Sequence, residues 1–193
     1  MSDDTEPKFH GQELKDKHAV AIGRIAMAWN ELHENLAEFF GQLFEEADYG
    51  LALTSWHALV SDNAQREMLR AVAEVKLGNE SKAYKELYWS LKQIKKQISN
   101  LRNTGVHMPL MSFTDLASDD RTHQILPLSM FGNRKAIAME TSGKDILKEY
   151  ADYERQIRNI GSYCFAIMFN VSPRRAGPEK WPGRPNLDSS AQN

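Results

Sequence analysis

The feature that most constrains this chain is a long apolar stripe near its N-terminus. Between residues 13 and 47, large apolar side chains recur at alternating spacings of three and four. That spacing places them on one face of an α-helix. Such a helix far exceeds the mean length of about 11–12 residues, so we expect a bundle spine or a dimerising helix. The stripe consists of Ile22, Ile25, Trp29, Leu32, Leu36, Phe39 and Leu43.

Four further stretches have the same helical rhythm. A short apolar helix is expected at 51–60, and a second between the capping residue Ser61 and Gly78. Ser and Asp favour the first position of a helix, and Gly favours its end. A third helix follows Ser81 and is expected to end at Gly105 and Pro109. The last long helix is expected at 144–170. The sequence therefore predicts an all-α fold, an antiparallel bundle of four to five helices.

The stretch at about 108–143 interrupts this rhythm with two Pro and two Gly residues. We expect an irregular or β-hairpin-like insertion, with 124–129 pairing with 135–139 across the turn at 131–133. An insertion of this length beside a functional residue is often a lid or a binding loop. The predicted organisation is a flexible arm at 1–11, one helical domain at 12–171, and a basic, Pro-rich flexible tail at 172–193.

Composition narrows the class of protein. The chain of 193 residues has 41% hydrophobic and 26% charged residues, which is typical of one globular domain. A single cysteine, Cys164, excludes an internal disulfide and fits a reducing compartment. No apolar run approaches the roughly 18–20 residues of a membrane span, so we expect a cytoplasmic protein. Gly-rich phosphate loops, a His-Glu-x-x-His motif and zinc-type cysteine pairs are absent from the sequence, and we expect neither a cofactor nor a metal.

Charge is unevenly distributed along the chain. Residues 1–50 hold 11 acidic and 4 basic side chains, whereas residues 51–193 hold 15 acidic and 20 basic ones. Much of this basic charge flanks the apolar stripe of the helix after Ser81, where it could attract phosphate. Ordinary solvated helix faces explain the same pattern equally well. The lysines that we assign to RNA binding are Lys92, Lys95 and Lys96.

At the end of this basic helix, the sequence Leu101-Arg102-Asn103-Thr104-Gly105-Val106-His107 holds an Arg and a His separated by four residues. Arg binds phosphate through a rigid fork of donors, and His transfers protons near neutral pH. Together they are a minimal set for phosphodiester chemistry. The alternative interpretation is structural, because an Arg near a helix C-terminus also stabilises the last carbonyl groups.

This motif, an Arg, a polar residue, a short spacer and a His at the end of a helix, resembles the signature of the HEPN domains (higher eukaryotes and prokaryotes nucleotide-binding). The resemblance covers roughly residues 15–110 and the last helix, and it includes the long helix around Ala28-Trp29-Asn30-Glu31-Leu32. It implies an all-α homodimer with two facing motifs. Many members are metal-independent endoribonucleases of toxin–antitoxin, abortive-infection or CRISPR-linked systems.

The resemblance also implies roles for three residues. Arg102 would bind the scissile phosphate, His107 would transfer a proton as the ribose 2′-hydroxyl attacks, and Asn103 would orient the pair. Gly105 within the spacer, Pro109 and the insertion depart from the family pattern.

We therefore expect a HEPN-like endoribonuclease of a defence or toxin-type system, with RNA as substrate and an antitoxin or operon product as partner. Two alternatives stay open. One is a catalytically silent helical homodimer that serves as a protein- or nucleic-acid-binding module. The other is a protein whose Lys-rich helix and tail bind nucleotide or nucleic acid without cleaving it.

Overall fold

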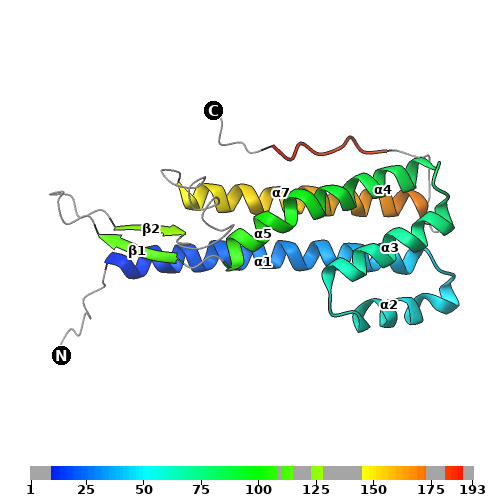
Figure 1. Cartoon of the computed structure of the whole chain (residues 1–193), viewed down its shortest axis with the longest axis horizontal. Helices are drawn as coiled ribbons and strands as arrows, with labels where there is room; N and C mark the ends of the chain where they lie inside the picture. The colour runs from blue at the N-terminus through cyan, green and yellow to red at the C-terminus, as the bar shows by residue number, and fades with distance from the viewer. Residues whose placement is uncertain (1–9, 108–109, 115–122, 128–144, 173–180, 189–193) are drawn as a thin grey trace, which may run out of the picture.

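In a computed structural model, the described residues are 10–107, 110–114, 123–127, 145–172 and 181–188. They form an all-α bundle of five helices, because α4, η2 and α5 join end to end into one helix (Figure 1). The helical bundle predicted from the sequence is thus confirmed. The helices are α1 (His10–Gln42), α2 (Tyr49–Ala58), α3 (Asp62–Leu77), α4 (Lys82–Gln93), α5 (Ser99–His107) and α7 (Ile146–Val171), with a 3-10 turn, η1, at Glu46–Asp48 and a π-helical turn, η2, at Ile94–Ile98.

Consecutive helices alternate in direction, but α1 and α7 run parallel along the length of the molecule (Figure 1). These two helices make the most extensive contact in the bundle. Cross-links between them preserve chain order, since Asn35 Nδ2 donates to the carbonyl of Gly161 and Ser172 Oγ donates to Gln42 Oε1. The prediction of an antiparallel bundle therefore needs correction for this pair. In an alternating series of five helices, the first and the last have the same direction.

Several helix ends follow the predicted capping chemistry. Ser61 Oγ accepts a hydrogen bond from the amide of Ala64, and Ser81 Oγ accepts one from the amide of Tyr84. Gly78 ends α3 with a φ of 79°, a left-handed conformation that favours glycine. The first helix is shorter than predicted: α1 ends at Gln42, and the next residues make i→i−3 hydrogen bonds rather than continuing to residue 47.

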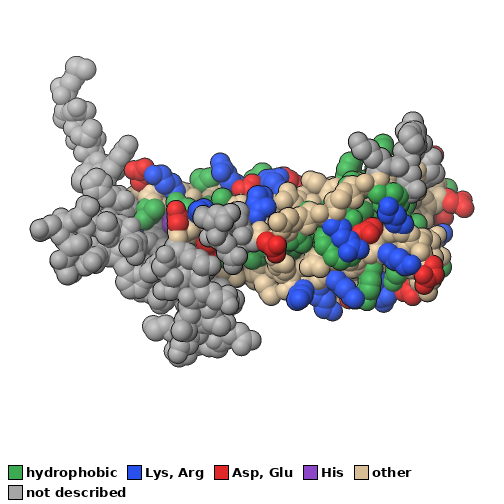
Figure 2. Space-filling view, turned by 90° about the horizontal axis from the view of Figure 1, so that it is seen from above, with side chains coloured by type: hydrophobic (Ala, Val, Ile, Leu, Met, Phe, Trp, Pro, Cys, Tyr) green, Lys and Arg blue, Asp and Glu red, His purple; other side chains and the backbone are tan. Residues whose placement is uncertain are grey.

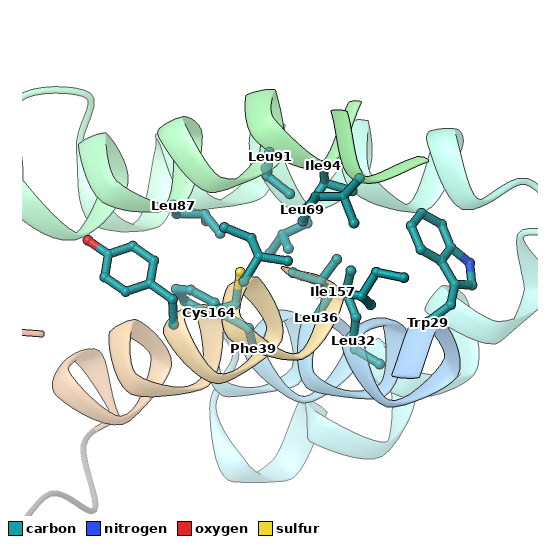
Figure 3. Packing of buried hydrophobic residues seen from close by; sticks show 14 of the residues in the cluster. Trp29, Leu32, Leu36, Phe39, Leu69, Leu87, Leu91, Ile94, Ile157 and Cys164 are labelled. Atoms are coloured by element: carbon teal, nitrogen blue, oxygen red, sulfur yellow. The ribbon is translucent and has the colours of Figure 1, made fainter. Parts of the chain in front are cut away.

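The core lies between α1, α7 and the helix formed by α4, η2 and α5 (Figure 3). Every apolar side chain of the N-terminal stripe except Ile22 is buried, and Ile22 packs against the core at its edge. Cys164 lies in this core, as the sequence predicted, and burial raises the pKa of its thiol to about 12. This thiol therefore stays protonated and serves as a small apolar group. Among the described residues, no helix is both long and apolar enough to cross a membrane.

Two short strands, β1 (Leu110–Thr114) and β2 (His123–Pro127), pair in antiparallel register, with Ser112 opposite Ile125. The strand predicted at 124–129 overlaps β2, but its partner is β1 on its N-terminal side. The turn predicted at 131–133 and the strand predicted at 135–139 lie outside the described residues.

Part of the predicted tail packs against the bundle. In the segment from Trp181 to Asp188, Arg184 Nε donates to Glu86 Oε2 at 2.7 Å, and Leu187 is buried. Gln97 Nε2 donates to the carbonyl of Leu187 at 2.7 Å. These contacts attach the segment to α4 and η2.

Candidate functional site

The helix that carries the motif continues through Gly105 and ends at His107. The sequence predicted that Gly105 and Pro109 would end this helix; its last residue, His107, lies between them, so Gly105 itself does not end the helix. Gly105 is buried against α1, where a Cβ atom would lie 2.5 Å from Ile25 Cδ1. The glycine therefore permits a close approach of α5 to α1, and the spacer between Arg102 and His107 stays helical.

A π-helical turn precedes the motif. In η2, Ile94 and Ile98 are fully buried, and Ser99 Oγ donates to the carbonyl of Ile94 at 2.8 Å. A π-turn holds about one residue more than an α-turn, and one residue corresponds to about 100° of rotation around the helix. It thus changes the face on which the side chains of α5 emerge. Such turns occur often at functional sites.

The three motif side chains meet at the end of α5. Arg102 Nη1 donates to Asn103 Oδ1 at 2.9 Å and lies 3.1 Å from His107 Nε2. Because an Arg can only donate, Nε2 is the acceptor, and the proton of the neutral imidazole lies on Nδ1. Asn103 and His107 are exposed, whereas the Arg102 side chain is 23% exposed. Two groups able to contact a phosphodiester are thus side by side and open to solvent.

Two residues from other helices fix the Arg102 guanidinium. Asp62, the first residue of α3, accepts from Arg102 Nη2 at 2.9 Å through its Oδ2. The same oxygen accepts from Trp29 Nε1 at 3.1 Å. The guanidinium also stacks over the Trp29 ring, with its carbon 4.8 Å from the ring centroid. Arg102 is therefore held on one edge by a carboxylate and on one face by an indole, with Nη1 directed at His107.

A second cationic side chain lies behind this group. Arg66 of α3 is 8% exposed, its guanidinium lies 5.8 Å from the Trp29 ring centroid, and its Nη1 lies 3.3 Å from His33 Nε2. Gln65 Oε1 accepts from His33 Nδ1 at 3.3 Å, so the neutral ring is again protonated on Nδ1. Burial lowers the pKa of His33; Arg66 and Arg102 lower it further, against the opposing effects of Asp62 and Gln65. His33 is therefore neutral near neutral pH.

Little in the sequence indicates that the additional residues around Arg102 belong to a functional site. Trp29 lies on the apolar stripe, Asp62 stands in a capping sequence and His33 borders the stripe, so each has an ordinary structural explanation. Only packing of α1, α3 and α5 brings them to Arg102. The motif residues, in contrast, are near one another in the chain, and helical geometry alone places Arg102 and His107 at one helix end.

The three lysines assigned to RNA binding are exposed on one side of the same helix. Lys92 Nζ lies 4.3 Å from the centroid of the Tyr88 ring, and Lys95 Nζ lies 3.7 Å from Glu67 Oε1. For Lys96, exposure is the only feature relevant to a nucleic acid. Figure 2 shows Lys and Arg side chains together, with acidic ones between them, over the half of the molecule that holds α4.

The chemistry of the cluster is that of anion binding with an adjacent proton acceptor. In the described part of the chain, no group of three or more His, Cys, Asp or Glu side chains is arranged to hold a metal ion. Models of known protein families, curated proteins and solved structures gave no match to this chain.

Proposed function

We propose that this protein is a HEPN-like endoribonuclease that cleaves RNA phosphodiesters without a metal, at Arg102 and His107. The proposal includes a role in a defence or toxin-type system and control by an antitoxin or operon partner. Its main support is the contact between Arg102 Nη1 and His107 Nε2, 3.1 Å apart at an exposed helix end. A phosphate oxygen that replaced His107 as the acceptor of Arg102 would leave Nε2 free to accept a proton.

The reaction would follow from these two positions. The ribose 2′-oxygen forms a bond to phosphorus, its proton passes to His107 Nε2, and the bond from phosphorus to the 5′-oxygen breaks. The 5′-oxygen takes a proton from solvent or from a second acid. The products are a 2′,3′-cyclic phosphate and a 5′-hydroxyl. Arg102 would stabilise the negative charge that develops on the phosphate oxygens, and Asn103 would orient Arg102 through its Oδ1.

A homodimer is part of this proposal, because the resemblance implies two facing motifs. Large apolar side chains are exposed on α1 and α7, including Met27 on α1 and Phe169 on α7. Burial of such side chains between two copies would be favourable. Sedimentation or mass photometry of the purified protein measures its oligomeric state directly.

The decisive experiment is cleavage of a labelled single-stranded RNA by the purified protein in EDTA. We expect Arg102→Ala to reduce the rate by about 10²–10³-fold and His107→Ala by about 10²–10⁴-fold. An RNA with a 2′-O-methyl group at the cleaved nucleotide should stay intact, because its 2′-oxygen cannot lose a proton. The end groups of the products, read by mass spectrometry, should be the cyclic phosphate and the 5′-hydroxyl.

Two exposed residues provide matched controls. Arg24→Ala and His57→Ala remove the same side-chain types elsewhere on the surface and should leave cleavage unchanged. Equal activity in all variants would mean that the activity comes from another site or a contaminant. Absence of activity across several RNAs would favour the second candidate, a catalytically silent binding module, which the ion pair between Arg102 and Asp62 also supports.

A further inference from the structure

We infer that the groove between α3 and the helix formed by α4 and η2 binds the single-stranded RNA that flanks the scissile phosphate, with Tyr88 as the platform for one base. This inference rests on the proposed function, because it treats the Arg102 cluster as the end of the groove where cleavage occurs. It adds a binding subsite and a specificity residue to that function.

The groove is built from two helix faces. A cavity of about 230 Å³ lies between Asn63, Arg66 and Arg70 on α3 and Tyr88, Lys92 and Lys95 on α4 and η2. On each helix these positions are three or four residues apart, so they form one continuous face. The two helices run in opposite directions (Figure 1), so Lys95 lies beside Glu67 of α3. The groove therefore runs between these two helices.

Arg66 connects this groove to the candidate cleavage site. It lines the groove, while its guanidinium also contacts His33 and lies over the Trp29 ring that supports Arg102. Burial lowers the pKa of Arg66; Asp62 opposes this effect, and Arg102 adds to it. Because Arg66 touches both, one end of the groove lies at the residues that hold Arg102. At a rise of 1.5 Å per residue, Tyr88 lies about 20 Å from Arg102 along the helix. A few nucleotides of RNA span this distance.

The charge of the groove fits a phosphate backbone. Its lining includes the four basic side chains Arg66, Arg70, Lys92 and Lys95 and one acidic side chain, Glu67. Glu67 Oε2 accepts from Arg70 Nε at 3.1 Å, and Glu67 Oε1 lies near Lys95. Exposed ion pairs of this kind are weak, so phosphate groups can replace the carboxylate. Binding should therefore depend on salt concentration.

Tyr88 adds an aromatic ring to this basic groove. The residue is 37% exposed, and its ring stacks on that of Tyr84 with an interplanar angle of 5°. Lys92 Nζ lies 4.3 Å from its centroid. Single-stranded nucleic-acid sites combine a basic groove with an aromatic side chain on which a base stacks. A partly exposed ring that lines the same groove as four cationic side chains meets that description.

The test measures RNA binding by fluorescence anisotropy in the His107→Ala background, so that the RNA stays intact. We expect Tyr88→Ala to weaken binding by about 5- to 150-fold, and Tyr88→Phe to retain it because the ring remains. Tyr88→Leu preserves apolar bulk without a stacking plane and should weaken binding like Tyr88→Ala. It serves as the second variant should Tyr88→Ala fail to fold. Leu51→Ala, which removes an exposed apolar side chain on α2, is the control and should bind normally.

An RNA series with one abasic nucleotide at each position locates the stacked base. One position should weaken binding to the parent protein and have no further effect in Tyr88→Ala, because both changes remove the same contact. Glu67→Gln should act in the opposite direction and tighten binding, since it removes the carboxylate that competes with phosphate.

The outcomes separate this inference from the proposed function. Normal binding by Tyr88→Ala would overturn the inference, and RNA cleavage that requires Arg102 and His107 would still support the enzyme. Absence of RNA binding by the parent protein would also overturn the inference. Binding that depends on Tyr88 in a protein that cleaves nothing would support the groove and refute the proposed nuclease activity.

Discussion

At the scale of single residues, Asp62 has the most consequential position. Its Oδ2 accepts hydrogen bonds from Arg102 and Trp29, which come from two different helices. Both donors converge on one carboxylate oxygen, so the position of Arg102 depends on a residue that would not itself contact RNA in the proposed reaction. Asp62 is thus a positioning residue in that proposal.

We predict that Asp62→Ala lowers RNA cleavage through Arg102. A misplaced group in an active site can cost about 10²-fold in rate, and we expect a loss of that order in kcat with a smaller change in KM. In the Arg102→Ala background, Asp62→Ala should cause no further loss, since the residue that it positions is gone.

Kinetics of the two single variants and the double variant provide the measurement. Thermal unfolding of each variant serves as the control for folding. Losses that multiply in the double variant would show that Asp62 acts independently of Arg102.

At the scale of elements, the approach of α5 to α1 decides where the motif lies. Gly105 faces Ile25, which is fully buried, and the absence of a Cβ atom allows the two helices to touch. Gly161 on α7 is also a buried helical glycine, but the nearest atoms to an added Cβ would lie 3.6 Å away. The two glycines therefore offer a matched comparison of one tight and one ordinary contact.

We predict opposite effects for the two glycine-to-alanine changes. Gly105→Ala should lower the free energy of unfolding by about 1–2 kcal/mol, because the overpacking cost of about 1–3 kcal/mol exceeds the gain in helix propensity of about 0.5–1 kcal/mol. Gly161→Ala should be neutral or slightly stabilising for the latter reason. Urea denaturation measures both values.

Removal of the opposing methyl group gives a further check on the tight contact. Ile25→Val deletes Cδ1, so Gly105→Ala should cost less in that background than in the parent protein. Equal stability of Gly105→Ala and Gly161→Ala would contradict the tight contact between α5 and α1.

At the scale of the whole molecule, the bundle includes a segment without regular secondary structure. Trp181 to Asp188 lies against α4 and η2, with Lys82 over the Trp181 ring at 4.9 Å and Arg184 over the Trp89 ring at 4.9 Å. Tyr163 of α7 and Arg184 both donate to Glu86 Oε2, at 2.8 Å and 2.7 Å. Glu86 thereby joins α4, α7 and this segment.

We predict that Leu187→Ala destabilises the protein by about 2 kcal/mol, since Leu187 is buried by the bundle. For a chain of this size, the melting temperature should fall by about 4–8 °C. Leu51→Ala removes the same side chain at an exposed position on α2 and should change stability by less than about 0.5 kcal/mol. A Leu187→Ala protein as stable as the parent would mean that the segment contributes nothing to the bundle in solution.

Much of the fold could be predicted from short-range patterns. The spacing of Leu32, Leu36 and Phe39 indicated a buried helix face, and Ser61 and Ser81 indicated helix starts, because periodicity and capping depend on neighbours within a few residues. Short-range helical geometry also predicted that Arg102 lies near His107, because both residues belong to the same helix end. Short-range patterns did not predict the role of Gly105, a residue that usually weakens a helix but here lies in close contact with Ile25 of another helix.

The sequence by itself thus determined the helices, most of their ends, the buried stripes and the nearness of Arg102 to His107. Tertiary structure alone decided that α1 and α7 pack against each other, that Asp62 and Trp29 hold Arg102, and that Arg66 connects this cluster to the groove beside Tyr88. These features depend on how helices rotate and pack against one another. A single π-turn in η2 changes that rotation by about 100°, and the local pattern of residues does not reveal it.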